Sequence, residues 1–290
     1  DLSPADAQAL GLEGQIGLLQ GQHQPDLPTS ILTRIAQNSA PAWANHGIAM
    51  ARQGRRIEAL EAFRRAVAIP LAEDPRNVEA HIVAYNYMGV DELERGDLEA
   101  ADASFRKMIE LIPQWDAQVA AERRYSRYRE GQRKLLSATV VAYSNLGIIA
   151  SRRGALNDAV EFQDAAIEAA ELIVKLEQGD KGASIGDMDR ALTVACAAYV
   201  NGAVAYRNRA AAARSSRNAA ADLEVAVTYL ERAVAAHPGS PEAWNALGEM
   251  YYRVRRFADA ETAFQEAVRL DGQNETYRNN LTAVGERLRR

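Results

Sequence analysis

The sequence of 290 residues is poor in cysteine, in aromatic residues and in charge of one sign. Its single cysteine, Cys196, excludes an internal disulfide and any metal site built from several thiolates. Lys and Arg number 34 against 39 Asp and Glu, so the net charge is −5. This balance gives no global attraction to nucleic acid or to an anionic membrane, and neither is expected as a partner.

Long hydrophobic runs are missing as well. The longest stretch without a charge, residues 135–151, contains Ser, Thr and Asn and is shorter than the ~20 apolar residues that cross a bilayer. We interpret it as a buried helix, with no membrane insertion. The chain starts at Asp1 without a signal peptide, which is compatible with a cytoplasmic protein or with an exported one whose signal peptide has been removed.

What is abundant is alanine. Hydrophobic residues make up 48% of the chain while aromatic residues make up 7%, and Ala is the strongest helix former. The clearest helical stretch is AWNALGEMYYRVRRFADAETAFQEAV, residues 243–268, where apolar residues recur three and four positions apart on each side of the polar break RVRRFAD. This stretch predicts an antiparallel helix pair, begun by Ser240 as N-cap and Pro241 at the first helical position.

The same pattern recurs along the chain. A small residue in the first helix lies 12 positions before an alanine of the second helix in four copies, at 47 and 59, 89 and 101, 147 and 159, and 248 and 260. In a further copy the distance from 203 to 226 is 23, which indicates an insertion of 11 residues around RAAAARSSRN and a long turn over residues 207–220. One hairpin cannot bury its own apolar face, so repeated hairpins must stack.

This pattern resembles the tetratricopeptide repeat family, whose unit reads W-x2-L-G-x2-Y, then A-x3-F, A and a closing Pro, here Pro113 in the second copy. The resemblance implies an all-α fold, a right-handed superhelical α-solenoid of about five to six irregular repeats. It places a capping segment with a degenerate repeat over residues 1–39, where Gly14 and Gly21 lie. The array spans 40–274, with first helices centred near 47, 89, 147, 203 and 248, and residues 275–290 form a C-terminal capping helix.

The resemblance also implies a concave groove lined by fixed positions of the first helices. Lys and Asn, which hold a partner's C-terminal carboxylate in chaperone-docking members, are replaced here by Ala44 and Ile48, so a co-chaperone role is not expected. The groove is instead largely apolar, and we expect it to bind an amphipathic helix or an extended apolar peptide, or else to be filled by its own side chains or by the N-terminal segment. The predicted groove residues are Ile48, Arg52, Asn86, Val90, Ser144, Ile148, Arg152, Val200, Val204, Asn245, Glu249 and Tyr252.

A basic segment, residues 122–134, precedes the third copy. Two tyrosines lie between its cations, an arrangement that can bind phosphates or stack on bases, although a solvated helix with internal ion pairs or a dock for an acidic protein explains it as well. The basic residues are Arg123, Arg124, Arg127, Arg129, Arg133 and Lys134.

No pattern in the sequence indicates catalysis. The four histidines are far apart, so no metal site is expected, and the Gly-rich stretch GDKGASIGD at 179–187 lacks the ending of a phosphate-binding loop. We therefore predict a protein-interaction scaffold without cofactors that is not an enzyme. The alternatives are an accessory factor for assembling an envelope, secretion or pilus complex, and a self-assembling scaffold.

Overall fold

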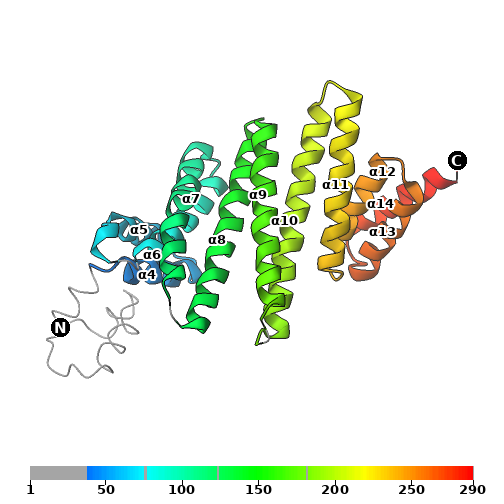
Figure 1. Ribbon diagram of the computed structural model, residues 1–290. Coiled ribbons are helices and arrows are strands. Elements are labelled where there is room, and N and C mark those ends of the chain that lie inside the picture. The colour runs from blue at the N-terminus through cyan, green and yellow to red at the C-terminus, as the bar shows by residue number, and fades with distance from the viewer. Residues whose placement is uncertain (1–37, 75–76, 123, 181, 290) are drawn as a thin grey trace, which may run out of the picture. The chain divides into compact units, whose positions relative to one another are not determined.

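The structure is a computed structural model that describes residues 38–289 except 75–76, 123 and 181. Within these residues the chain is helical and has no β-strand, as predicted for an all-α solenoid (Figure 1). The helices, labelled as in Figure 1, are α4 (Ala40–Arg52), α5 (Arg56–Ala68), the short 3-10 helix η1 (Leu71–Glu73), α6 (Asn77–Glu94), α7 (Leu98–Ala120), α8 (Tyr125–Arg152), α9 (Leu156–Gln178), α10 (Ile185–Ala212), α11 (Ser216–Ala236), α12 (Pro241–Arg253), α13 (Phe257–Leu270) and α14 (Glu275–Leu288).

The chain divides into two compact units, an N-terminal unit over Asp1–Ala138 and a C-terminal unit over Thr139–Arg290. Within each unit, helices that follow one another in the sequence pack side by side, from α4 to α7 in the first and from α9 to α14 in the second. The predicted cap over residues 1–39 lies outside the described residues except for Asn38 and Ser39.

Serine caps and proline fix where two of the hairpins begin. The Ser240 hydroxyl accepts a hydrogen bond from the backbone N–H of Ala243 at 3.2 Å, and a proline occupies the first turn of α12. Ser39 caps α4 in the same way through the N–H of Ala42, at 3.4 Å. The predicted start of α12 is therefore confirmed, because a capped first turn satisfies a backbone donor that the helix cannot pair itself.

Hairpins are closed by a glycine of the first helix that faces a large side chain of the second. A Cβ atom added at Gly89 would lie 2.9 Å from the ring of Phe105, and one at Gly248 would lie 2.6 Å from Phe264. The facing pairs are Gly47 with Phe63, Gly89 with Phe105, Gly147 with Gln163 and Gly248 with Phe264. The two helices of a hairpin can approach this closely because glycine has no side chain.

The third pair is an exception that the sequence pattern did not flag. Gln163 stands where the other hairpins carry Phe and is 2% exposed. Its Nε2 donates a hydrogen bond to the carbonyl oxygen of Ser144 at 2.9 Å. This bond to the first helix satisfies part of the amide, which would otherwise be costly to bury.

The second hairpin is longer than its closing proline predicted. Pro113 lies inside α7, which continues to Ala120, so the expectation that this proline ends the hairpin is wrong. Proline removes one backbone hydrogen bond within a helix, yet Trp115 and Val119 beyond it are 6% and 7% exposed. Burial of these side chains compensates for the lost bond. Val119 packs closely on Gly131 of α8, where an added Cβ atom would lie 2.9 Å from the Val119 side chain.

The insertion in the fourth hairpin also differs from the prediction. The expected long turn over residues 207–220 is wrong, because α10 runs to Ala212 and α11 begins at Ser216. The inserted residues lengthen both helices, and the Arg209 guanidinium pairs with both oxygens of Asp222, at 3.0 and 2.7 Å. A two-point ion pair of this kind has a fixed geometry and holds the extended helix ends together.

A polar ladder of tyrosines and carboxylates joins α9, α10 and α11. The hydroxyls of Tyr206 and Tyr229 each donate to the Asp164 carboxylate at 2.9 Å, one to each oxygen. About two turns further along α9, Glu171 accepts a hydrogen bond from the Tyr199 hydroxyl at 2.8 Å. Arg232 pairs with the same carboxylate at 2.9 Å. One acceptor on α9 thus serves donors from two later helices, a contact that sequence analysis did not predict.

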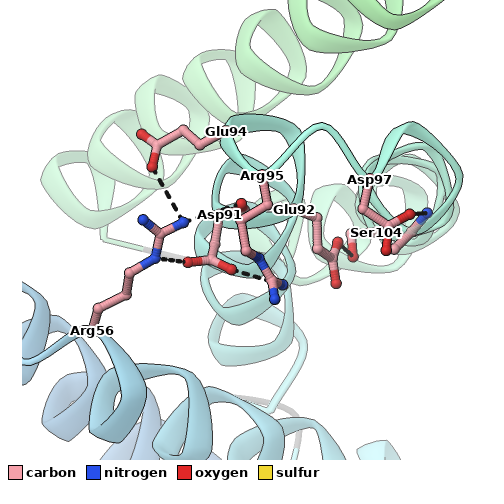
Figure 2. Close-up of polar contacts among 8 residues, drawn as sticks. Arg56, Asp91, Glu92, Glu94, Arg95, Asp97 and Ser104 are labelled. Carbon is pink, nitrogen blue, oxygen red and sulfur yellow. Dashed lines mark hydrogen bonds and ion pairs between the residues drawn. The ribbon is translucent and has the colours of Figure 1, made fainter.

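An ion-pair cluster ties α5 to α6 in the N-terminal unit (Figure 2). Arg56, the first residue of α5, reaches Asp91 and, at 3.5 Å, Glu94 on α6. Asp91 is 7% exposed in its side chain and also pairs with Arg95 at 2.9 Å. The buried carboxylate is therefore neutralised from both sides, as burial of a charge requires.

One described helix, Ser126–Arg152, is long and apolar enough to cross a membrane by length and composition alone. Core helices of soluble proteins have the same composition when their apolar side chains pack inside the protein. Leu146 and Ile149 of this helix are 1% and 0% exposed. Only 39% of the most apolar 18-residue window of this helix is buried, however, so the run 135–151 is partly buried rather than the fully buried helix that we expected.

Candidate partner-binding groove

A cavity of about 800 Å³ opens between the last three helices of the C-terminal unit. Its lining residues come from α12, the turn after it, α13 and α14: Glu249, Tyr252, Arg253, Arg255, Phe257, Phe264, Asn280, Ala283, Glu286 and Arg287. A small cavity of about 20 Å³ between α10, α11 and α12 is lined by Val200, Ala203, Val204, Arg207, Leu230, Ala246, Glu249 and Met250. Glu249 lines both cavities, which therefore adjoin at this residue, and we call the two cavities together the C-terminal groove.

Hydrogen bonds connect α14 to α12 along one wall of this groove. Asn280 on α14 donates to the side-chain oxygen of Asn245 at 2.9 Å, and Asn245 donates to Glu249 at 2.9 Å. The helix predicted as a terminal cap thus contributes directly to the cavity. Sequence analysis identified Asn245 and Glu249, whereas Asn280 was missed because its register depends on how α14 packs.

Aromatic rings form the floor of the larger cavity. The rings of Tyr252 and Phe257 meet edge to face with centroids 5.2 Å apart, and the Arg287 guanidinium lies 5.5 Å from the centroid of Phe257. Tyr252 is 39% exposed although it is a large ring. Exposed aromatic surface beside cations is typical of protein-binding sites.

Two arginines on the rim carry charge that the described part of the chain does not neutralise. Arg253 and Arg255 line the cavity and form no ion pair with any described residue. The adjacent Arg256 differs, because it pairs with Asp259 at 2.6 Å. In the first hairpin, Arg55 at the corresponding turn also pairs, with Glu58.

The turn that contains Arg255 has the hydrogen bonds of the other short turns but a different residue. Arg255 donates its backbone N–H to Tyr252 at 3.1 Å, and Arg256 donates to Tyr251 at 2.8 Å. The residues with positive φ at this position are Gly54 at 75°, Gly96 at 79°, Gly154 at 76° and Arg255 at 64°. Only glycine takes this left-handed conformation without steric cost, so Arg255 is strained.

Replacing Arg255 with glycine should therefore raise the free energy of unfolding, by about 0.5–1 kcal/mol once the greater freedom of an unfolded glycine is deducted. Thermal unfolding followed by circular dichroism measures the change. The control is Gly154→Ala, which should destabilise by a similar amount because no atom lies within 4 Å of an added Cβ and only the backbone is strained. An Arg255→Gly variant that is less stable than the parent would contradict the assignment of strain.

Other predicted groove residues of the C-terminal unit lie along the first helices. Val200 and Val204 of α10 line the small cavity and are half-buried. Ser144 and Ile148 of α8 are also half-buried, and Arg152 is exposed at the end of that helix. The structure thus brings Val200, Val204, Glu249 and Tyr252 into the two cavities.

The predicted groove residues of the N-terminal unit form a separate set on α4 and α6. Ile48 packs against the core of the first hairpins, and Arg52 is exposed in the last turn of α4. Asn86 is half-buried, and Val90 is 37% exposed. These four residues belong to a different compact unit from the C-terminal groove.

The basic segment extends α8 at its start. Arg123 lies outside the described residues, Arg124 and Arg127 are exposed, and Arg129 and Arg133 are half-buried. Lys134 pairs with Glu79 of α6 at 3.0 Å and with Glu130 at 3.4 Å. The Glu130–Lys134 pair lies within one helix, which favours the interpretation as a solvated helix with internal ion pairs.

The histidines, the Gly-rich stretch and the cysteine noted in the sequence have structural roles where the structure describes them. His46 packs edge to face on Trp43, and His81 bonds the Ile69 carbonyl oxygen at 2.9 Å; burial lowers the pKa of both imidazoles. Ser184 in the Gly-rich stretch caps α10, and Cys196 is buried, as predicted. Among the described residues no group of three His, Cys, Asp or Glu is placed to hold a metal ion; His23 lies outside them.

Comparison with known proteins shows which protein family has similar repeats. Two family models described as tetratricopeptide repeat match residues 139–175 and 219–275. No match to the chain was found among curated proteins.

Two solved structures have a similar fold. BtubC (BKLC) from P. vanneervenii is 18% identical with a TM-score of 0.50, over 78% of this chain and 79% of that one. The MamA RS-1 ArsTM double mutant is 16% identical with a TM-score of 0.50, over 81% and 96%. At these identities the similarity concerns the fold alone. The matched family models, together with the stacked hairpins and their glycine–phenylalanine pairs, show that the chain contains tetratricopeptide repeats, at residues 139–175 and 219–275.

Proposed function

We propose that the C-terminal groove binds a segment of a partner protein and that the chain acts through it as an interaction scaffold. The observation that carries this proposal is that the two cavities adjoin at Glu249, which lines both of them. Residues from α10, α12 and α14 therefore offer one surface to a single bound segment.

The chemistry of the groove favours a segment with spaced apolar side chains. Val200 and Val204 are half-buried and Tyr252 is exposed, so apolar area remains for a partner to cover. Each apolar side chain buried there would contribute about 1.5–3 kcal/mol before the cost of association. An amphipathic helix or an extended peptide can place such side chains at regular intervals.

In this proposal residues 40–274 form the repeat array and residues 275–290 complete its binding surface. The lining of the larger cavity by Ala283 and Arg287 of α14 supports a binding role for this helix in addition to its role as a cap. The N-terminal unit remains available for other contacts, with the exposed Val90 on α6.

Peptides selected from a displayed random library on the folded protein should lose binding when Val200 and Val204, which both line the small cavity, are replaced by aspartate. A carboxylate in an apolar contact must be desolvated, so we expect at least about a tenfold loss of affinity. The measurement is fluorescence anisotropy with the selected peptides. Leu172→Asp is the matched control, because Leu172 on α9 is 49% exposed and lines neither cavity. Equal binding by the double variant and the parent would reject the groove.

A further inference from the structure

The larger cavity carries an excess of positive charge in a chain whose net charge is negative. Its lining includes Arg253, Arg255 and Arg287 against Glu249 and Glu286, while the whole chain has a net charge of −5. A local cationic site on an acidic protein attracts an anionic ligand and disfavours a cationic one.

One of the two glutamates is held by a neighbour. Glu249 accepts a hydrogen bond from Asn245 at 2.9 Å, and Asn245 in turn accepts one from Asn280. This chain of bonds fixes Glu249 on the wall between α12 and α14. It does not neutralise Arg253 and Arg255, which form no ion pair with a described residue.

Arg255 occupies a position at which three other short turns have glycine. Its φ of 64° carries a steric cost that glycine would remove, and its side chain lines the cavity. Backbone strain in a folded protein is often found at functional sites, where another requirement fixes the residue. Here the feature that glycine lacks is the guanidinium on the cavity rim.

From these observations we propose that the larger cavity binds an acidic peptide segment that carries an aromatic or large apolar side chain. The apolar side chain lies against Tyr252 and Phe257, while carboxylates on its flanks pair with Arg253, Arg255 and Arg287. This assignment rests on the proposed function and specifies the chemical class of its partner. Arginine suits the role because its planar guanidinium can hold a carboxylate through two hydrogen bonds.

The test uses three fluorescein-labelled peptides that share a central tryptophan. The first has glutamates on both sides of it, the second has glutamines and the third has lysines. Anisotropy titrations of the full chain at low and high salt should rank the glutamate peptide first, by about tenfold over the glutamine peptide at low salt, because charged hydrogen bonds exceed neutral ones. The preference should shrink as salt screens the charges.

Substitutions of the cavity arginines distinguish a loss of charge from a loss of folding. Arg255→Gly and Arg255→Asn should each weaken the glutamate peptide about fivefold, leave the glutamine peptide unchanged and keep the protein folded, since both residues accept positive φ. Arg255→Lys should retain most of the preference. Arg253→Ala should likewise weaken the glutamate peptide and leave the glutamine peptide unchanged. Its control is Arg278→Ala, because Arg278 is exposed on α14 and lines neither cavity.

Equal binding of the glutamate and glutamine peptides, or an unchanged preference in Arg255→Gly, would overturn the proposal. So would a second copy of the chain in the cavity, shown by sedimentation coefficients that rise with concentration while the labelled peptides fail to bind. The outcome is separable from that of the proposed function. If library peptides require Val204 but ignore these arginines, the groove is a binding site and only its acidic selectivity is wrong.

Discussion

Phe105→Ala is expected to lower the free energy of unfolding of the N-terminal unit by about 3–5 kcal/mol. Phe105 is 0% exposed, and its ring fills the space that Gly89 leaves on the facing helix. The backbone of α6 cannot move into the vacated volume without disturbing its own packing, so a cavity remains. Urea denaturation followed by circular dichroism measures the loss. Val90→Ala on the facing helix α6 is the control, with an expected change of less than about 1 kcal/mol at this exposed site.

A double-mutant cycle tests whether the glycine and the phenylalanine act as a pair. Gly89→Ala alone should cost about 1–3 kcal/mol, because its Cβ would lie 2.9 Å from the ring. Combined with Phe105→Leu, the alanine gains room, and the pair should be about 1–2 kcal/mol more stable than the sum of the single changes predicts. The chain already contains this combination, since Ala203 and Leu230 line one cavity of the fourth hairpin. Additive losses would show that the two positions are independent.

The hairpin repeat was predictable because its signals are local. A short turn fixes the 12 residues between the small residue of one helix and the alanine of the next, so the spacing can be read without knowing any distant contact. The Ser240 cap and the glycine–phenylalanine pairing follow from the same local geometry. Each of these features lies within one repeat.

The lengths of the long helices were not predictable in this way. Pro113 is a stop signal in isolation, and the stretch around residues 209–218 contains Arg and Ser beside its alanines. In the structure, burial of Trp115 outweighs the proline. The ion pair of Arg209 with Asp222 holds Arg209, which the prediction placed in a long turn, against the start of the next helix. Tertiary contacts therefore overrode local preference at both places.

Part of the groove was predictable for a related reason. Glu249 and Tyr252 occupy first-helix positions that the repeat pattern assigns to a concave surface, and both line the larger cavity. Phe257 and Arg287 come from later helices, so their place depended on the packing of α13 and α14. Arg255 did leave a signal in the sequence, because it stands where three other turns have glycine.

The polar ladder should make the C-terminal unit sensitive to alkali. Burial, together with the hydrogen bond to Asp164, raises the pKa of Tyr206 to about 12 and raises the pKa of Tyr229 further in the same direction. An unfolded tyrosine titrates near pH 10. The folded state therefore holds these protons more tightly than the unfolded state, and the resulting stabilisation is complete below pH 10 and lost as the pH rises through about 12.

The groups that face these two hydroxyls are Asp164 of α9, Arg209 of α10, and Asp222 and Arg232 of α11. Urea midpoints measured between pH 9 and pH 12 should fall more steeply for the parent than for the Tyr206→Phe/Tyr229→Phe variant, which has neither proton to lose. Asp164→Ala should reduce the stability at neutral pH by about 2–3 kcal/mol, because two half-buried hydroxyls lose their acceptor. Parallel pH curves for the parent and the double phenylalanine variant would show that the ladder does not control stability in alkali, whatever its geometry.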